Sequence, residues 1–519
     1  MQKILLLTFF AISLAFSCYL PPVYLFTDTK MLPKFYLCLL GVACGGLLGA
    51  MAKLKGKQLP SFEVVFPMAS VAFVVVSVLE CLYVAGDIVA VGFRPSGECG
   101  TFENPAGLAL NLCVAIPPAM HLLRTGKEQW MQVLSALAVG LLVAALLSTR
   151  SRTGLICLSF YGVVYAGMGI HHFVGKRVVR RGLYAVLVAA VAVGMIAYVG
   201  SHKTESTSGR TFILMRSWEL VKEHPLVGHG RGGFEREYML RQAAYFREHP
   251  DSELAVLADE IHHPLNEFVR LWVDGGMAAP VLLLVLLTLP LWIAFRERNA
   301  ELRVLGLPLV AVFLFSCFSY PFLFPVAWLV VGATTVLSVV RMWRPSRRQE
   351  RMVSSITLAA SLALIVLTVN DAVQEYRWNQ AYHHSFKEME ALEEYEELHG
   401  YFSRDPYFLY NYAMAAFKRG DLDRADRLIG ECGKYRNGYN RELLAGDICL
   451  YRHEYADAAT HYEMANCMCP VRFAPLEGLY KVYEAKGDTA RRKWVAKLIA
   501  EKKVKVHSWD VMRIKENCK

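Results

Sequence analysis

Charged side chains are scarce in this sequence. They make up 20% of the 519 residues, whereas hydrophobic side chains make up 55% and the mean hydropathy is +0.30. A soluble domain carries about 25% charged residues, so this composition excludes an ordinary water-soluble protein and indicates a membrane protein. The apolar runs lie within residues 1–371, whereas residues 372–519 have a soluble mixture. We predict two domains with these bounds, a membrane body and a soluble tail.

The sequence also lacks the patterns of several common binding sites. Its net charge is +10, but no basic patch with interleaved aromatics suggests a nucleic-acid partner, and the excess charge lies in short loops between apolar runs. Cys467 and Cys469 are too close for easy mutual bridging, and no second cysteine or histidine pair completes a zinc pattern. We expect no metal site and no cofactor.

Apolar runs long enough to cross a bilayer, which takes ~20 residues, recur along the first domain. Residues 4–20 could instead be a cleaved signal peptide, because Lys3 precedes an apolar run that ends at Cys18; we favour a retained span. The sequence thus predicts an all-α, polytopic helical bundle of about eleven spans. The predicted spans are 4–20, 34–52, 63–84, 105–123, 130–148, 153–170, 182–200, 267–295, 303–318, 321–340 and 353–370.

Every second loop between the predicted spans is rich in lysine and arginine. The positive-inside tendency places these basic loops in the cytoplasm, so the alternate loops, including the long segment 201–266, and the tail should lie in the periplasm of a bacterial inner membrane. The basic loops contain Lys53, Lys55 and Lys57; Arg124 and Lys127; Lys176, Arg177, Arg180 and Arg181; Arg296, Arg298 and Arg303; and Arg341, Arg344, Arg347, Arg348 and Arg351.

The tail repeats itself over residues 405–502. The stretch from Ala415 to Asp421 returns from Cys449 to Tyr455 and again from Val482 to Asp488. A period of roughly 34 residues is typical of helix-turn-helix units that stack into an α-solenoid, and this pattern resembles tetratricopeptide repeats. The concave face of such a solenoid would suit a peptide or protein partner. A plain stack of helical hairpins without a ligand is the alternative.

Two arginines lie in a tight turn on the side of the membrane without basic loops. Arg150 and Arg152 stand in the segment Ser148–Gly154 between two apolar runs. A charged side chain costs roughly 2.5–3.5 kcal/mol at the centre of a bilayer and less near its edge, so an arginine here either snorkels or pairs with an anion. A pair flanked by hydroxyl groups favours an anion site.

The long loop 201–266 carries a second group of candidates. Arg210 follows Ser208 and Gly209 where we predict the start of a helix that runs through Arg216, and its guanidinium could add to the free backbone donors there. His224 begins the glycine-rich segment His224–Phe234. Glycines at this density permit sharp turns or a close approach of backbone to a ligand, but the segment is not a P-loop, since it lacks the lysine.

His262 and His263 precede Asn266 at the predicted start of the eighth span. Histidine has the side-chain pKa nearest neutrality, so one at the membrane edge could take a proton from a hydroxyl group. Adjacent histidines point to different sides of a helix, which disfavours a zinc pair. A structural role, in which either histidine caps a helix, is the other alternative.

Five motifs occur in an order that resembles a known family. They are Phe102–Pro105, Ser151–Gly154, Ser208–Arg210, His224–Gly230 and His263–Gly276. Together, over residues 90–340, they resemble the O-antigen ligase and polymerase superfamily, which includes protein O-oligosaccharyltransferases. In that family the histidine and asparagine are usually adjacent, whereas Pro264 and Leu265 separate them here.

The resemblance implies a GT-C-like membrane enzyme and a role for each motif. Arg152 and Arg210, assisted by Arg150, would hold the diphosphate of an undecaprenyl-linked glycan. His263 would deprotonate the acceptor hydroxyl, which attacks the anomeric carbon and inverts it, without a metal. The supporting or alternative residues are His262 (the other candidate base), Asn266, Arg216 and His224.

We therefore expect a membrane glycosyltransferase resembling the O-antigen ligases of lipopolysaccharide biosynthesis. The acceptor could be a lipid A core sugar, the end of another lipid-linked glycan, or a protein serine or threonine, and a tail in the periplasm would suit a protein partner. A lipid-linked glycan transporter would instead require charged or helix-breaking residues near the span midpoints. A repeat-bearing membrane scaffold would leave the arginines and histidines unexplained.

Overall fold

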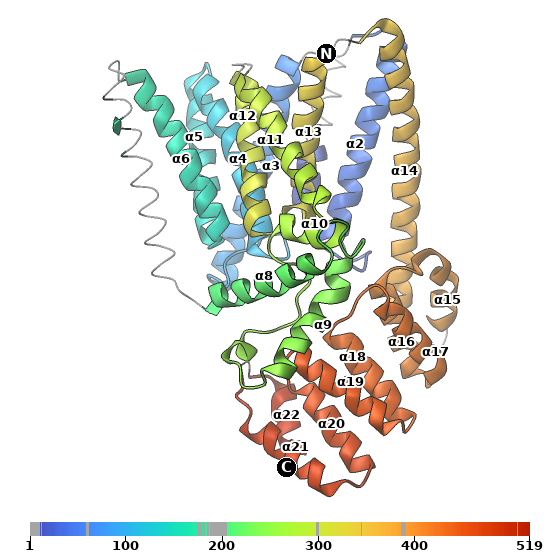
Figure 1. Cartoon of the computed structure of the whole chain (residues 1–519). Coiled ribbons are helices and arrows are strands. Elements are labelled where there is room, and N and C mark those ends of the chain that lie inside the picture. Colours follow the sequence, from blue (N-terminus) through green and yellow to red (C-terminus); the bar gives the residue numbers. More distant parts are fainter. Residues whose placement is uncertain are drawn as a thin grey trace. The chain divides into compact units, whose positions relative to one another are not determined.

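The computed structural model describes residues 11, 13–58, 62–173, 179, 182–183, 186, 205–296, 300–343, 345–385, 391–505 and 507–518. These described residues form helices and no strands, which confirms the all-α class (Figure 1). The chain divides into two compact units. The membrane unit comprises Met1–His202 and Leu282–Tyr376, and the loop–tail unit comprises Lys203–Val281 and Arg377–Lys519.

The membrane unit contains helices long and apolar enough to cross a bilayer. Five meet both requirements: α2 (Met31–Leu54), Val65–Val91 within α3 (Phe62–Val91), α4 (Pro105–Thr125), α5 (Gln129–Ser148) and α14 (Arg347–His384). Shorter apolar stretches occur in α11 (Ala278–Arg296), α12 (Ala300–Phe318) and α13 (Pro325–Met342), and α6 spans Arg152–Phe173. The protein is therefore a multi-pass membrane protein. The number eleven stays a prediction, because most of span 182–200 and nearly half of span 4–20 lie outside the described residues.

Helix α4 forms the centre of the membrane unit. It is buried from Gly107 to Ala119. Its start is fixed by Asn104, whose side chain accepts a hydrogen bond from Gly107 N at 3.0 Å, with Pro105 in the first helical turn. The hydroxyl of Tyr161 on α6 donates to the carbonyl of Cys113 on α4, and it also lies 3.1 Å from a carbonyl of α12.

The predicted span 267–295 is wrong as one helix. The structure contains α10 (Glu267–Gly275) and then α11. Gly276 has φ +67°, and a Cβ at this position would overlap the Leu226 carbonyl. The left-handed conformation ends α10, and only glycine has room there. The sequence stays mostly apolar across this break, so hydropathy alone does not reveal it.

Two further spans differ from the prediction at their ends. The stretch predicted as 321–340 begins with a 3₁₀ turn, Pro321–Leu323, and α13 starts at Pro325, because proline suits the first position of a helix. Helix α14 continues far beyond the predicted 353–370, to His384. The helical residues that follow Asn370 are mostly polar and include neither glycine nor proline, so the helix continues past the apolar region.

The loop–tail unit joins two segments that are far apart in sequence. Its first segment contains α8 (Glu205–Glu223), α9 (Gly233–Glu248), a 3₁₀ turn and α10, and its second contains α15 (Ala391–Phe402) to α22 (Trp509–Asn517). One hydrophobic core joins them, since Phe234, Tyr238 and Met239 pack with Tyr439 and Met468. In Figure 1 the green α9 accordingly lies beside the orange-red α18 and α19. Both segments must therefore lie on the same side of the membrane; the periplasmic side stays a prediction.

The tail contains three pairs of helices with the predicted spacing. The pairs begin at Pro406, Tyr439 and Ala474 and comprise α16 (Pro406–Lys418) and α17 (Leu422–Gly433), α18 (Tyr439–Tyr451) and α19 (Tyr455–Met468), and α20 (Ala474–Ala485) and α21 (Thr489–Glu501). The turn inside each pair has one residue at positive φ: Gly420 (+77°), His453 (+63°) and Gly487 (+74°). The sequence repeat aligns Glu454, not His453, with the two glycines, so its predicted register is wrong by one residue in the middle pair. The classification as tetratricopeptide repeats stays a prediction.

Candidate active site

Side chains of the tail hold the segment that precedes the two candidate histidines. Glu260 Oε1 accepts a hydrogen bond from Arg436 at 3.1 Å. Asp259 Oδ1 accepts two from Arg472, at 3.0 and 2.7 Å, and the Asp259 carbonyl accepts one from Gln242 at 3.0 Å. Arginine contacts of this kind are charge-assisted and directional. The position of the histidines in the loop therefore depends on the tail.

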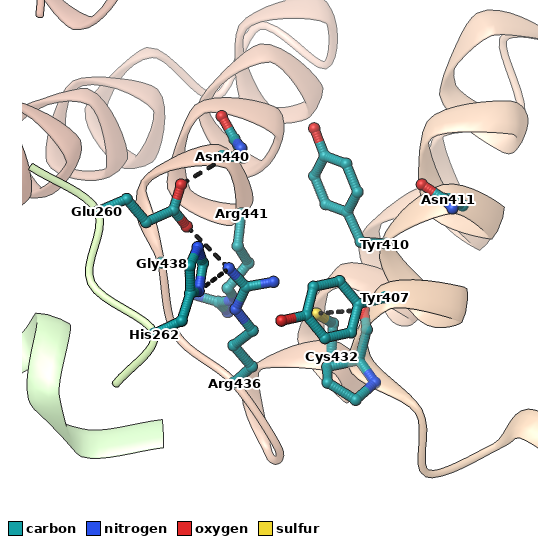
Figure 2. Close-up of a pocket in the computed structure, with 11 residues that line it drawn as sticks. Glu260, His262, Tyr407, Tyr410, Asn411, Cys432, Arg436, Gly438, Asn440 and Arg441 are labelled. Carbon is teal, nitrogen blue, oxygen red and sulfur yellow. Dashed lines mark hydrogen bonds and ion pairs between the residues drawn. The ribbon is translucent and has the colours of Figure 1, made fainter. Parts of the chain in front are cut away.

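The guanidinium of Arg436 also contacts His262 directly. His262 Nδ1 lies 2.9 Å from Arg436 Nη2, as Figure 2 shows. A guanidinium only donates, so Nδ1 is the acceptor and a neutral ring carries its proton on Nε2. Burial and the charges of Arg436 and Arg472 lower the pKa of His262 to about 4. In this geometry neither ring nitrogen of His262 is available to take a proton at neutral pH.

His263 has the properties of the better candidate base. Burial, the charge of Arg270 and the neighbouring His262 lower its pKa to about 4. The ring is neutral at pH 7 and has one nitrogen able to accept a proton. An anion bound nearby would raise this pKa and make the base stronger. Among the residues that the structure describes, no three His, Cys, Asp or Glu side chains gather as a metal site requires.

Asn266 follows the two histidines and marks the start of α10. Its Oδ1 accepts a hydrogen bond from Val269 N at 3.0 Å and caps α10. The alternative in which a histidine caps this helix is therefore wrong. Leu265 has φ +57°, an unusual value for a side chain of its size. The insertion of Pro264 and Leu265 thus makes a strained turn between the histidines and the cap.

Arg210 and Arg216 both lie on α8. This helix already includes Glu205, so the prediction that the segment Ser208–Arg210 opens it is wrong. Arg210 lies beyond the four free backbone donors of a helix start. Arg216 forms an ion pair with Glu219 at 3.0 Å and lies 4.7 Å from the centre of the Tyr245 ring. Arg216 therefore helps pack α8 against α9.

The glycine-rich segment folds back onto the end of α10. His229 N donates to Val273 O at 2.7 Å, and Gly230 N donates to Asp274 O at 2.9 Å. Gly228 has φ +69°, and its Cα lies against the backbone of Asp274 and Gly276. The glycines thus allow one backbone segment to approach another. The sequence had left open whether they serve sharp turns or a close approach to a ligand.

The side chain of Asp274 stabilises this contact. The Asp274 side chain accepts a hydrogen bond from Phe234 N at 2.9 Å, at the start of α9, and burial raises the pKa of Asp274. His224 is exposed, and its ring centre lies 4.7 Å from that of His229. Sequence reasoning did not identify Asp274 as a residue that ties α9 to α10.

The remaining predicted residues, Arg150 and Arg152, lie in the membrane unit. Arg150 is exposed, has φ +52°, and donates to the Pro95 carbonyl at 3.1 Å. Arg152 is the first residue of α6, and Ser151 Oγ accepts from Gly154 N at 3.2 Å. The histidines and Arg210 belong to the loop–tail unit. A common site formed by both groups stays a prediction.

One comparison with known proteins bears on this site. Residues 137–284 match the family model described as O-antigen ligase. The matched range contains the Arg150–Arg152 turn, all of α8 to α10 and both histidines, which supports the ligase and polymerase superfamily that the motifs suggest. The tail lies outside it. No curated protein matches the chain.

Proposed function

We propose that the protein is a membrane glycosyltransferase that moves a glycan from undecaprenyl diphosphate to an acceptor in the periplasm, with inversion and without a metal. The observation that carries the proposal is the setting of His263. It is a neutral imidazole between a segment bound by two arginines and the capped start of α10. This setting lies inside the range that matches the O-antigen ligase family.

In the proposed reaction, His263 takes the proton of the acceptor hydroxyl. The hydroxyl oxygen forms a bond to the anomeric carbon while the bond from that carbon to the diphosphate oxygen breaks, and the electron pair leaves with the lipid diphosphate. Arg152 and Arg210, with Arg150, stabilise this negative charge, since guanidinium groups bind phosphate oxygens with two donors. Their charge would act mainly in the transition state.

The bound donor would also change the pKa of the candidate base, His263. The pKa of about 4 leaves His263 weakly basic in the empty protein. A diphosphate near it favours the protonated ring and raises the pKa toward neutrality, where general bases work best. His263 would thus become an effective base only when the donor is present, which limits unproductive proton transfer.

Glycan transfer by the purified full chain, with a lipid-linked donor, tests this assignment. We expect His263→Gln to reduce the rate by about 10²–10⁴-fold. His262→Gln should lose less, because the glutamine carbonyl can still accept from Arg436. Arg152→Ala and Arg210→Ala should weaken donor use, whereas Arg231→Ala, an exposed arginine of the same loop, serves as the control. Wild-type rates in all four site variants would refute the proposal.

The acceptor defines three versions of the same reaction. A lipid A core sugar makes the protein a ligase, the end of a second lipid-linked glycan makes it a polymerase, and a serine or threonine makes it a protein O-oligosaccharyltransferase. We favour the first, because the matched family is described as O-antigen ligase. Surface polysaccharides and glycoproteins of a deletion strain would distinguish the three, since each leaves a different product missing.

A further inference from the structure

A cavity of about 330 Å³ lies in the loop–tail unit beside His262 (Figure 2). Tyr407, Tyr410 and Asn411 of α16 form one wall, and Glu260 and His262 form the opposite one. The loop and the tail thus enclose it together. It is at the small end of the range of about 300–1,000 Å³ that ligand sites occupy.

The charged groups around the cavity neutralise one another. Arg436 pairs with Glu260 at 3.1 Å and lies 4.4 Å from the centre of the Tyr407 ring. Arg441 forms an ion pair with Glu442. A phosphate or an ammonium group would therefore meet no uncompensated charge here. The cavity suits a neutral ligand.

Neutral polar groups on α16 remain available to such a ligand. Within the part of the chain that the structure describes, the hydroxyls of Tyr407 and Tyr410 and the amide of Asn411 make no hydrogen bond to another residue. Phenol and amide groups both donate and accept, and the two rings add flat apolar faces. A pyranose ring presents the matching pattern, hydroxyl groups at its edge and C–H groups on its faces.

We propose that this cavity binds one neutral sugar ring of the acceptor glycan. The inference rests on the proposed function, because it assigns the acceptor half of that reaction. The ring would lie against His262, and the next residue in the chain is the candidate base His263. An extended peptide fits less well, since it advances about 3.3 Å per residue and requires a long groove.

Saturation-transfer NMR with the full chain in detergent tests the cavity without the need for turnover. The probes are glucose, galactose, N-acetylglucosamine and the tripeptide Ala-Ser-Ala. We expect at least one sugar to bind, and Asn411→Ala and Tyr410→Phe each to weaken it by about tenfold or less, the effect of one lost hydrogen bond. Tyr451→Ala, which alters an exposed tyrosine outside the cavity, should leave binding unchanged.

Three results would overturn the inference: no sugar binds, the tripeptide binds instead, or sugar binding is the same in both cavity variants as in the wild type. A matching thermal unfolding midpoint confirms that each variant is folded. The proposed function is judged separately, by the transfer rate of His263→Gln. If His263→Gln loses most of its transfer rate but no sugar binds, the sugar-site inference is rejected and the glycosyltransferase proposal is retained. If His263→Gln transfers at the full rate, the glycosyltransferase proposal is rejected.

Discussion

Arg436 in the tail donates a hydrogen bond to His262 Nδ1 in the loop across 2.9 Å. The two residues are 174 positions apart in sequence. Since the same guanidinium also binds Glu260, one side chain of the tail sets both the position and the protonation of the segment that leads to His263. The tail is therefore part of the candidate active site as well as a possible binding module.

Replacing Arg436 should change how stability depends on pH. The pKa of His262 is about 4 in the folded protein, against 6.5 ordinarily, so between these values the unfolded chain binds more protons and stability falls as pH falls. In Arg436→Gln one cause of the low pKa is absent, and the pKa of His262 should rise. The loss of stability between pH 6.5 and 4 that is due to this group should therefore shrink.

Thermal unfolding midpoints at pH 7.5 and 5 measure this effect. Arg491→Gln is the matched control, because Arg491 is exposed on α21 and is not among the groups that affect His262. A decrease from pH 7.5 to 5 that is the same in Arg436→Gln and the control would contradict the proposed coupling. Arg436→Gln should also slow glycan transfer, since the histidine segment loses a support.

Asn266 should be replaceable by aspartate but not by alanine. Asn266→Ala removes the cap of α10 and should cost about 1 kcal/mol in the free energy of unfolding. Asn266→Asp keeps an acceptor oxygen for Val269 N and adds a favourable charge at the helix start, so its unfolding midpoint should stay near the wild-type value. Equal midpoints for the two variants would show that the cap contributes nothing.

Two glycines of the same loop should differ in their tolerance of alanine. Gly228 and Gly230 both have positive φ, +69° and +87°, so either substitution strains the backbone. At Gly228 a Cβ would also lie 2.5 Å from Gly276 N, whereas at Gly230 it would meet nothing within 4 Å. Gly228→Ala should therefore cost about 1–3 kcal/mol more than Gly230→Ala, the range of an overpacked site.

Chemical denaturation of the purified protein, followed by tryptophan fluorescence, compares these two variants. The pair isolates steric overlap, because the conformational strain is present in both. If Gly230→Ala were the less stable variant, the close contact between the glycine-rich segment and the end of α10 would not exist in solution.

His453→Gly should stabilise the tail. His453 occupies the left-handed position that glycine occupies at Gly420 and Gly487. Relief of this strain should outweigh the greater freedom of glycine in the unfolded chain and the loss of the exposed contact with Tyr455 at 3.1 Å, for a net gain of about 0.5–1 kcal/mol. A lower unfolding midpoint for His453→Gly would refute this; Gly487→Ala should show the opposite sign.

Local patterns in the sequence predicted the features that depend on local chemistry. Hydropathy predicted the apolar helices. The repeat predicted three turns, but it paired Glu454 with Gly420 and Gly487, whereas the structure has its positive φ one residue earlier, at His453. The break at Gly276 was missed because the apolar run continues across it, and because the Leu226 carbonyl that leaves room only for glycine there is distant in sequence. Local signals report only what neighbouring residues impose.

The partners of the candidate residues could not be predicted for a similar reason. Arg436 and Arg472 look like ordinary surface arginines of a helical tail, and only the folded chain brings them to Glu260 and Asp259. The motifs identified His262 and His263, but the assignment of different roles required the contact with Arg436. Long-range pairing of side chains is a property of the tertiary structure.

The shared core of loop and tail has a consequence for synthesis. Phe234 and Tyr238 leave the ribosome long before Tyr439 and Met468, with which they pack. At about 5–20 residues per second, the interval is on the order of ten seconds or more. During that time the loop has been synthesised but lacks its packing partners. Newly made chains should then be open to chaperones and proteases, and a stop codon anywhere before Met468 would leave that state permanent.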